Sequence, residues 1–98
     1  MLIHETKSEQ NRQIYEKLRD EGNTRAVKGR NAYYIARDGS SKPAVTNLGV
    51  VMVVSEKGFK VKQEDGTLSE WYNYSYTKDR ARKPYYMFSD SNYTKDVA

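Results

Sequence analysis

The chain has 98 residues, too few for two domains with separate cores, and a hydrophobic share of 37% allows only one small core. It has no cysteine, which excludes disulfides and thiolate metal sites and suits a reducing compartment, so we expect a cytoplasmic location. No apolar run approaches the roughly 18 residues of a membrane span, and we expect no membrane partner.

The first predicted element is a helix over about residues 7–21. Thr6 and Glu9 have the spacing of a capping box, and the Gly-Asn pair at 22–23 would end the helix. Residues 1–23 carry four cations and five acids, which disfavours a DNA-recognition helix. The apolar stripe is narrow, so the helix should pack on another element; the stripe comprises Ile14, Tyr15 and Leu18.

Two strands are predicted next, at residues 32–36 and 48–54. "AYYIA" is rich in residues favoured on a pleated surface, although a helix competes there. "LGVVMVV" is the more strongly indicated strand, because its four valines are stiff at their branched carbon. Its unbroken apolar run predicts burial on both faces and a central place in the sheet.

Glycine turns bound the following strand, "FKVKQ" at residues 59–63. The first turn ends at Gly58, where we expect a positive φ, and Asp65-Gly66 is a stronger hairpin signal. Within the strand, Phe59 and Val61 are predicted to face the core and the alternating lysines to face solvent.

A long tyrosine-rich strand is predicted over residues 67–76. We interpret Trp71 as a core residue, or a lid on the core, in preference to a stacking platform. The side opposite Trp71 is expected to form a tyrosine face, whose large side chains are Leu68, Tyr72, Tyr74 and Tyr76.

Pro84 introduces a last short strand, "YYMF" at residues 85–88, expected at an edge because proline cannot donate to the ladder. These elements predict an α+β domain over residues 1–90. Its N-terminal helix packs on a strongly bent antiparallel sheet or an SH3-like barrel of four or five short strands, between about residues 32 and 88. Residues 91–98 are predicted to be a mobile C-terminal tail.

The run "NLGVVMVVSEKGFKVKQEDGTLSEWY", residues 47–72, resembles the meander of an SH3-like barrel of the Tudor and KOW kind. In those folds a glycine opens a valine-rich strand, a glycine turn reverses it, and a short amphipathic strand follows. An Asp-Gly turn then leads to the next strand. The resemblance covers about a quarter of the chain and implies a small barrel, and no aromatic cage is carried over from it.

Positive charge is concentrated in two stretches of the chain, although its net charge is only +4. Residues 24–37 hold four cations and no acid, and residues 78–83 hold four cations and one acid. Together they carry +7, so the remainder carries −3. Cations beside tyrosines are typical of surfaces that bind phosphate and stack unpaired bases, which predicts nucleic-acid binding, with RNA or single-stranded DNA favoured over duplex. The predicted phosphate contacts are Arg25, Lys28, Arg30, Arg80, Arg82 and Lys83, and the predicted stacking residues are Tyr34, Tyr74 and Tyr86.

No catalytic signature is present in the sequence. His4 is the single histidine, so neither a zinc site nor a Ser-His-Asp triad has enough members. The glycines are isolated, and Glu64 and Asp65 lie in a turn where water would screen them. We therefore predict a protein that is not an enzyme and takes no cofactor or metal.

The sequence leaves other interpretations open. The cations fit ordinary solvated surface charge equally well. The chain also fits a small protein-interaction module or inhibitor, of a kind that viruses encode, which would bind an acidic protein partner through the tyrosine face. A homodimer through an edge strand is a third option, disfavoured by Pro84. The oligomeric state, and whether residues 24–37 and 78–83 share one face, stay open.

Overall fold

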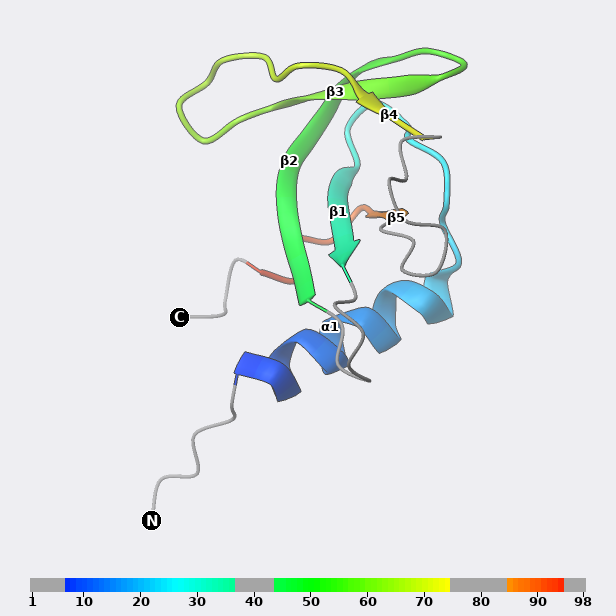
Figure 1. Ribbon diagram of the computed structural model, residues 1–98, viewed down its shortest axis with the longest axis vertical. Coiled ribbons are helices and arrows are strands. Elements are labelled where there is room, and N and C mark those ends of the chain that lie inside the picture. The colour runs from blue at the N-terminus through cyan, green and yellow to red at the C-terminus, as the bar shows by residue number, and fades with distance from the viewer. Residues whose placement is uncertain (1–6, 37–43, 75–84, 95–98) are drawn as a thin grey trace.

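The computed structural model describes residues 7–36, 44–74 and 85–94, apart from the side chains of residues 7, 8 and 85. It contains one helix and one antiparallel sheet, so the predicted α+β class is confirmed. The strands lie side by side in the order β4-β3-β2-β1-β5, with β4 and β5 at the two edges (Figure 1). The elements are α1 (Lys7–Glu21), β1 (Asn31–Ala36), β2 (Ala44–Val54), β3 (Gly58–Lys62), β4 (Tyr72–Asn73) and β5 (Tyr85–Ser89).

Helix α1 ends and packs as its sequence predicts. Gly22 adopts a φ of +70°, and its N–H donates to the Leu18 carbonyl at 3.0 Å, which closes the last turn. Ile14 and Leu18 are buried against β1 and β5, with the half-buried Tyr15 beside them. The predicted capping residue Thr6 lies outside the described residues.

The sheet is strongly bent because β2 carries two bulges. Leu48 is the extra residue opposite β1, and Met52 is the extra residue opposite β3. Bulges bend the strand that contains them and increase its twist. In Figure 1 the upper part of β2 consequently runs with β3 and β4, across the direction of β1.

Gly49 is required at the first bulge. Its φ is +129°, and a Cβ built there would lie 2.2 Å from the carbonyl oxygen of Lys62. Any larger residue would therefore combine a strained backbone with a steric clash.

The bent sheet separates two apolar cores. On the concave face, Phe59 of β3 is packed with residues of β1, β2 and β5 and of the chain before β1; the buried members are Ala26, Ala32, Val51, Phe59, Val61 and Phe88. The second core lies between the sheet and α1, as Figure 1 shows by the helix beneath the strands, and comprises Ile14, Leu18, Tyr33, Ile35 and Met87.

The strand that is buried on both faces is β1, which corrects the prediction made for residues 48–54. In β1, Ala32 faces one core while Tyr33 and Ile35 face the other, and all three are fully buried. β2 is central, as predicted, but only Val51 is buried in its last five residues. The reason is that β1 begins opposite Val50, so the end of β2 projects beyond it.

The tyrosine-rich strand predicted over residues 67–76 is not continuous in the described part of that range, residues 67–74. There Tyr72 and Asn73 form β4, and Leu68 makes an isolated bridge to Lys62. The Asp65-Gly66 turn is confirmed: Gly66 has a φ of +87°, and Asp65 Oδ1 accepts hydrogen bonds from the N–H and hydroxyl of Thr67. These hydrogen bonds lower the pKa of the Asp65 carboxyl.

Trp71 and Gly58 also differ from their predictions. Trp71 is half exposed and is not a core residue, because the chain enters β4 only at Tyr72. Gly58 does not have a positive φ. It is needed because a Cβ there would lie 2.1 Å from the carbonyl oxygen of Tyr72, so the glycine allows β4 to approach β3.

Residues 91–94 belong to the folded domain, which therefore extends past the predicted limit of residue 90. The Tyr93 N–H donates to the Tyr33 hydroxyl at 2.8 Å, and that hydroxyl donates to the Ser91 carbonyl at 2.7 Å. The Tyr93 hydroxyl donates to Glu21 at the end of α1, and this bond raises the pKa of Tyr93. The rest of the predicted tail, residues 95–98, lies outside the described residues.

Candidate nucleic-acid interface

The chain between α1 and β1, residues 22–30, packs against the β5 edge of the sheet. The Asn23 carbonyl accepts the N–H of Phe88 in β5 at 3.0 Å, and Ala26 is buried in the concave core. The Ala26 N–H donates to the Tyr74 hydroxyl at 2.9 Å. Tyr74 directly follows β4, so these bonds bring three segments of the chain together.

Arg25 lies at the centre of this junction. Its guanidinium carbon stands 5.1 Å from the centroid of the Tyr74 ring, a cation–π distance. The hydroxyl of that ring accepts a hydrogen bond from the Ala26 N–H, which restricts the ring beneath the exposed Arg25 side chain. A hollow of about 290 Å³ adjoins the pair, lined by Thr24, Arg25, Tyr74 and Tyr86.

The three predicted stacking residues belong to one aromatic cluster around Phe59, which we call the ring cluster. Ring centroids of Tyr74 and Tyr86 lie 5.8 and 5.1 Å from that of Phe59, and the Tyr34 centroid lies 5.8 Å from that of Tyr86. Tyr72 joins at 5.4 Å from Phe59. All four tyrosines are half buried, so each contributes to the core as well as to the surface. The cluster therefore holds the rings rigidly.

Of the other predicted phosphate contacts, Lys28 and Arg30 are described and do not line the hollow. Nε of Arg30 lies 3.6 Å from an oxygen of Asp90, an ion pair at the opposite end of β5 from Tyr86. Lys28 is exposed in the turn before β1. Arg80, Arg82 and Lys83 lie outside the described residues.

The predicted tyrosine face is divided between two sides of the sheet. Of its members, Tyr72 and Tyr74 pack against the concave core, Leu68 is half exposed and bridges to Lys62, and Tyr76 lies outside the described residues. The alternation used to predict this face fails between Leu68 and Tyr72, because residues 69–71 are not in a strand.

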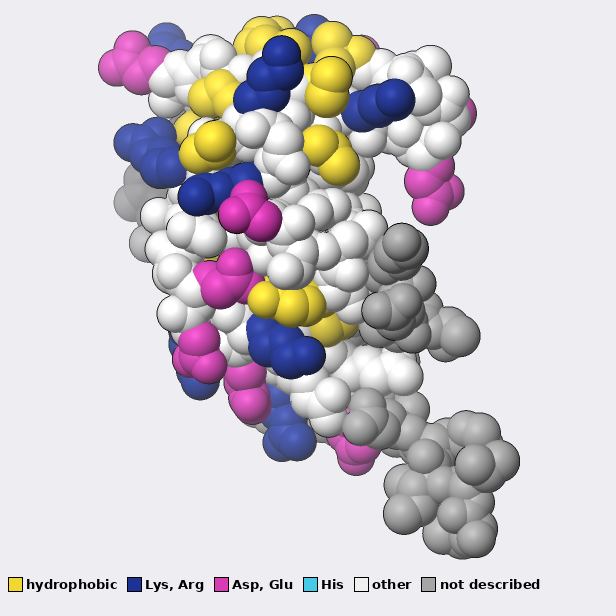
Figure 2. All heavy atoms as spheres, turned by 180° about the vertical axis from the view of Figure 1, so that it is seen from behind, with side chains coloured by type: hydrophobic (Ala, Val, Ile, Leu, Met, Phe, Trp, Pro, Cys, Tyr) yellow, Lys and Arg dark blue, Asp and Glu magenta, His cyan; other side chains and the backbone are white. Residues whose placement is uncertain are grey.

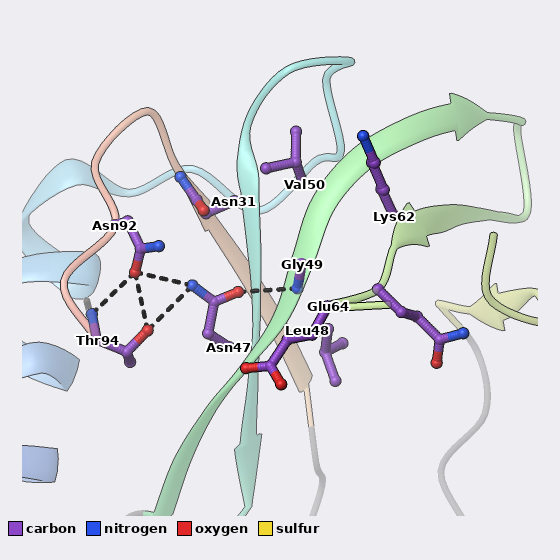
Figure 3. Close-up of a pocket in the computed structure, with 10 residues that line it drawn as sticks. Asn31, Asn47, Leu48, Gly49, Val50, Lys62, Glu64, Asn92 and Thr94 are labelled. Atoms are coloured by element: carbon purple, nitrogen blue, oxygen red, sulfur yellow. Dashed lines mark hydrogen bonds between the residues drawn. The ribbon is translucent and has the colours of Figure 1, made fainter. Parts of the chain in front are cut away.

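A second, larger hollow of about 540 Å³ lies beside the first bulge of β2 and was not predicted (Figure 3). Asn47 makes three hydrogen bonds beside it. Its Nδ2 donates to Asn92 Oδ1 and to Thr94 Oγ1, both at 3.1 Å, and its Oδ1 accepts from the Gly49 N–H at 2.8 Å. These groups bond to one another, as the dashed lines in Figure 3 show. The arrangement anchors residues 92–94 to the bulge rather than presenting a set of open donors.

Sequence reasoning missed Thr24, which lines the first hollow, and the role of Phe59 as the ring that contacts Tyr74 and Tyr86. Phe59 was correctly predicted as core, but its role as the contact point of the tyrosines depends on the bend of the sheet. No pattern in the sequence indicates that Thr24 lines this hollow. Within residues 7–36, 44–74 and 85–94, no group of three or more His, Asp or Glu side chains could hold a metal ion.

Comparisons with protein-family models, with curated proteins and with solved structures found no match to this chain. No helix in the described part of the chain is long and apolar enough to cross a membrane.

Proposed function

We propose that this protein binds nucleic acid without catalysis, and that it takes RNA or single-stranded DNA in preference to duplex. The observation that supports this proposal most strongly is the placement of Arg25 on the Tyr74 ring beside the hollow. Unpaired bases stack on aromatic side chains and on guanidinium planes, and a guanidinium also binds phosphate with two parallel hydrogen bonds. Arg25 is held in place before a ligand arrives, which lowers the entropic cost of binding.

The ligand would enter at the hollow. Arg25 would contact a phosphate or lie against a base, and Tyr86 of β5 would contact the base. In the sequence, Arg80, Arg82 and Lys83 occur in the segment that joins Tyr74 to Tyr85, and we propose that they add phosphate contacts. Lys28 and Arg30 have a lesser part in this proposal, because they do not line the hollow.

We also propose that the bent sheet is a partly open SH3-like barrel. The ring centroids of Tyr72, on one edge strand, and Tyr86, on the other, are 5.9 Å apart. The two edges of the sheet thus approach each other through side chains, and Phe59 of β3 contacts both rings. This closure by rings supports a barrel more than a flat sheet.

The function is tested by fluorescence anisotropy with labelled single-stranded RNA, single-stranded DNA and duplex DNA over a salt series. We expect affinity to fall steeply with salt and Arg25→Glu to weaken binding by about tenfold or more, because one phosphate contact becomes a repulsion. The matched control is Arg19→Glu, since Arg19 also stands over a tyrosine ring, 5.8 Å from the Tyr15 centroid, but on α1.

An Arg80→Glu/Arg82→Glu variant tests the segment outside the described residues separately. If the wild-type protein binds none of the three ligands at low salt, or if Arg25→Glu and Arg80→Glu/Arg82→Glu both bind as the wild type does, the proposal is wrong. If duplex DNA binds most tightly, the preference for single strands is wrong.

A further inference from the structure

The convex side of β2 and β3 carries a surface that the proposed nucleic-acid interface does not use. Residues directly opposite in an antiparallel pair point to the same face. Val50 is paired with Lys62, and Val53 with Lys60, while the intervening Val51 and Val61 are buried in the concave core. The first four side chains therefore lie on the convex face.

Two further apolar side chains extend this face. Leu68 bridges to Lys62, which places it on the same side. Nζ of Lys60 stands 5.1 Å from the centroid of the Trp71 ring, so Trp71 lies there too. We call the whole set the outer face; it comprises Val50, Val53, Lys60, Lys62, Leu68 and Trp71.

The outer face leaves large apolar side chains in water. Leu68 is 49% exposed, Trp71 is 50% exposed, and the two valines are exposed by more than a third. Figure 2 shows hydrophobic side chains gathered at the top of the molecule with lysine or arginine side chains among them. Contiguous exposed apolar groups of this kind mark interaction sites, whereas scattered ones need no explanation.

We propose that the outer face binds an acidic, apolar segment of a protein partner. Branched aliphatic side chains offer no ring on which a base can stack, and Trp71 is the one ring of the outer face. A protein segment can instead bury apolar side chains on Val53, Leu68 and Trp71 and place carboxylates on the two lysines.

Other occupants fit less well. Acids occur in both flanking turns, Glu56 before β3 and Glu64 and Asp65 after it, and they would repel the extended charge of an anionic bilayer or a nucleic-acid backbone. A second copy docked by a twofold axis would bring Lys60 and Lys62 of both chains together. A short segment needs carboxylates only where it meets Lys60 and Lys62, so it does not have to extend over those turns as a bilayer or a nucleic-acid backbone would.

The outer face and the hollow lie on opposite sides of β3, since Phe59 points to the ring cluster and Lys60 points away from it. The proposal therefore does not depend on the proposed nucleic-acid binding, and each can fail alone.

The test uses Trp71, the single tryptophan of the chain, as its own reporter. A phage-displayed library of random 12-residue peptides is panned on the full-length protein, with counter-selection on Lys60→Glu. We expect the enriched peptides to combine Asp or Glu with large apolar residues. Synthetic copies of them should shift the Trp71 emission to shorter wavelength at peptide concentrations below about 1 mM.

Two variants and a control make the result specific. Lys60→Glu should weaken peptide binding by about tenfold or more, and Leu68→Gln should weaken it by a similar factor, because one removes the charge partner and the other the apolar contact. Lys17→Glu should bind as the wild type does, since Lys17 also stands over a ring, 5.3 Å from the Tyr93 centroid, but on α1.

Several results would overturn the proposal. These are the failure of any peptide to remain after counter-selection, the enrichment of basic peptides, or an equal loss of binding in all three variants. The Trp71 shift must also be absent with phosphatidylserine vesicles, with single-stranded RNA and on raising the protein concentration alone. A shift in one of those experiments, with none from the peptides, would assign the outer face to a membrane, to nucleic acid or to a second copy.

Discussion

At the scale of single residues, Tyr33 shows how one buried hydroxyl links pH to stability. The side chain is fully buried in the core under α1, and its hydroxyl bonds to Ser91 and Tyr93. Burial raises the pKa of Tyr33 from 10.0 to about 12, because the ionised phenolate would lose its hydration.

This shift predicts a loss of stability at alkaline pH. Between pH 10 and about 12 the unfolded chain releases the Tyr33 proton while the folded chain retains it, so the free energy of unfolding falls as the pH rises. The stabilisation is complete below pH 10, and about 2 to 3 kcal/mol is lost by the time the pH exceeds the folded pKa. Urea denaturation at a series of pH values measures it.

Tyr33→Phe is the control for this prediction. At neutral pH the variant should be about 1 to 3 kcal/mol less stable, because it loses the two hydrogen bonds of the hydroxyl. Its stability should then decline less steeply than that of the wild type in alkali. An equally steep decline would mean that other tyrosines cause the alkaline unfolding.

At the scale of the elements, β4 depends on Gly58. With only two residues, β4 has little ladder of its own, and the missing Cβ of Gly58 allows its close approach to β3. We expect Gly58→Ala to cost about 2 to 4 kcal/mol, because the added methyl would clash with the Tyr72 carbonyl and move Tyr72 away from Phe59. Urea denaturation gives the cost, and Trp71 emission reports the movement of the neighbouring strand.

Gly66→Ala separates this steric effect from backbone strain. Gly66 has a φ of +87° with open space around it, so alanine there should cost only about 1 to 2 kcal/mol and leave the emission of Trp71 unchanged. Equal costs at the two glycines would show that the contact of Gly58 with β4 is unimportant.

At the scale of the whole molecule, the C-terminal segment closes the domain. Residues 91–94 join β1, the bulge of β2 and the end of α1 through Tyr93 and the Asn47 network. Ending the chain at residue 90 should cost about 2 to 4 kcal/mol, because the Tyr33 hydroxyl would lose its partners and the second core would lose a ring. Thermal and urea unfolding measure the cost, and a chain that ends at Thr94 should be nearly as stable as the full chain. If the chains ending at residues 90 and 94 lose similar stability, the important contacts lie beyond residue 94.

The elements themselves could be predicted from the sequence because their signals are local. Glycine after the helix, period-two alternation in "FKVKQ" and the Asp-Gly turn depend on backbone conformation within a few residues. Those signals correctly give α1, the inward direction of Phe59 and Val61, and the edge position of β5. Composition likewise directs attention to arginines and tyrosines, and Arg25, Tyr74 and Tyr86 do meet at one hollow.

The tertiary structure alone decides which faces are buried and which side chains meet. Burial on both faces belongs to β1, because the helix covers one side of it and the curled sheet covers the other, and neither cover is visible in "AYYIA". Bulges at Leu48 and Met52 set the bend, which gathers the ring cluster and turns Trp71 outward. A hydrophobic run records only that side chains are apolar, whereas their neighbours depend on contacts between segments far apart in the chain.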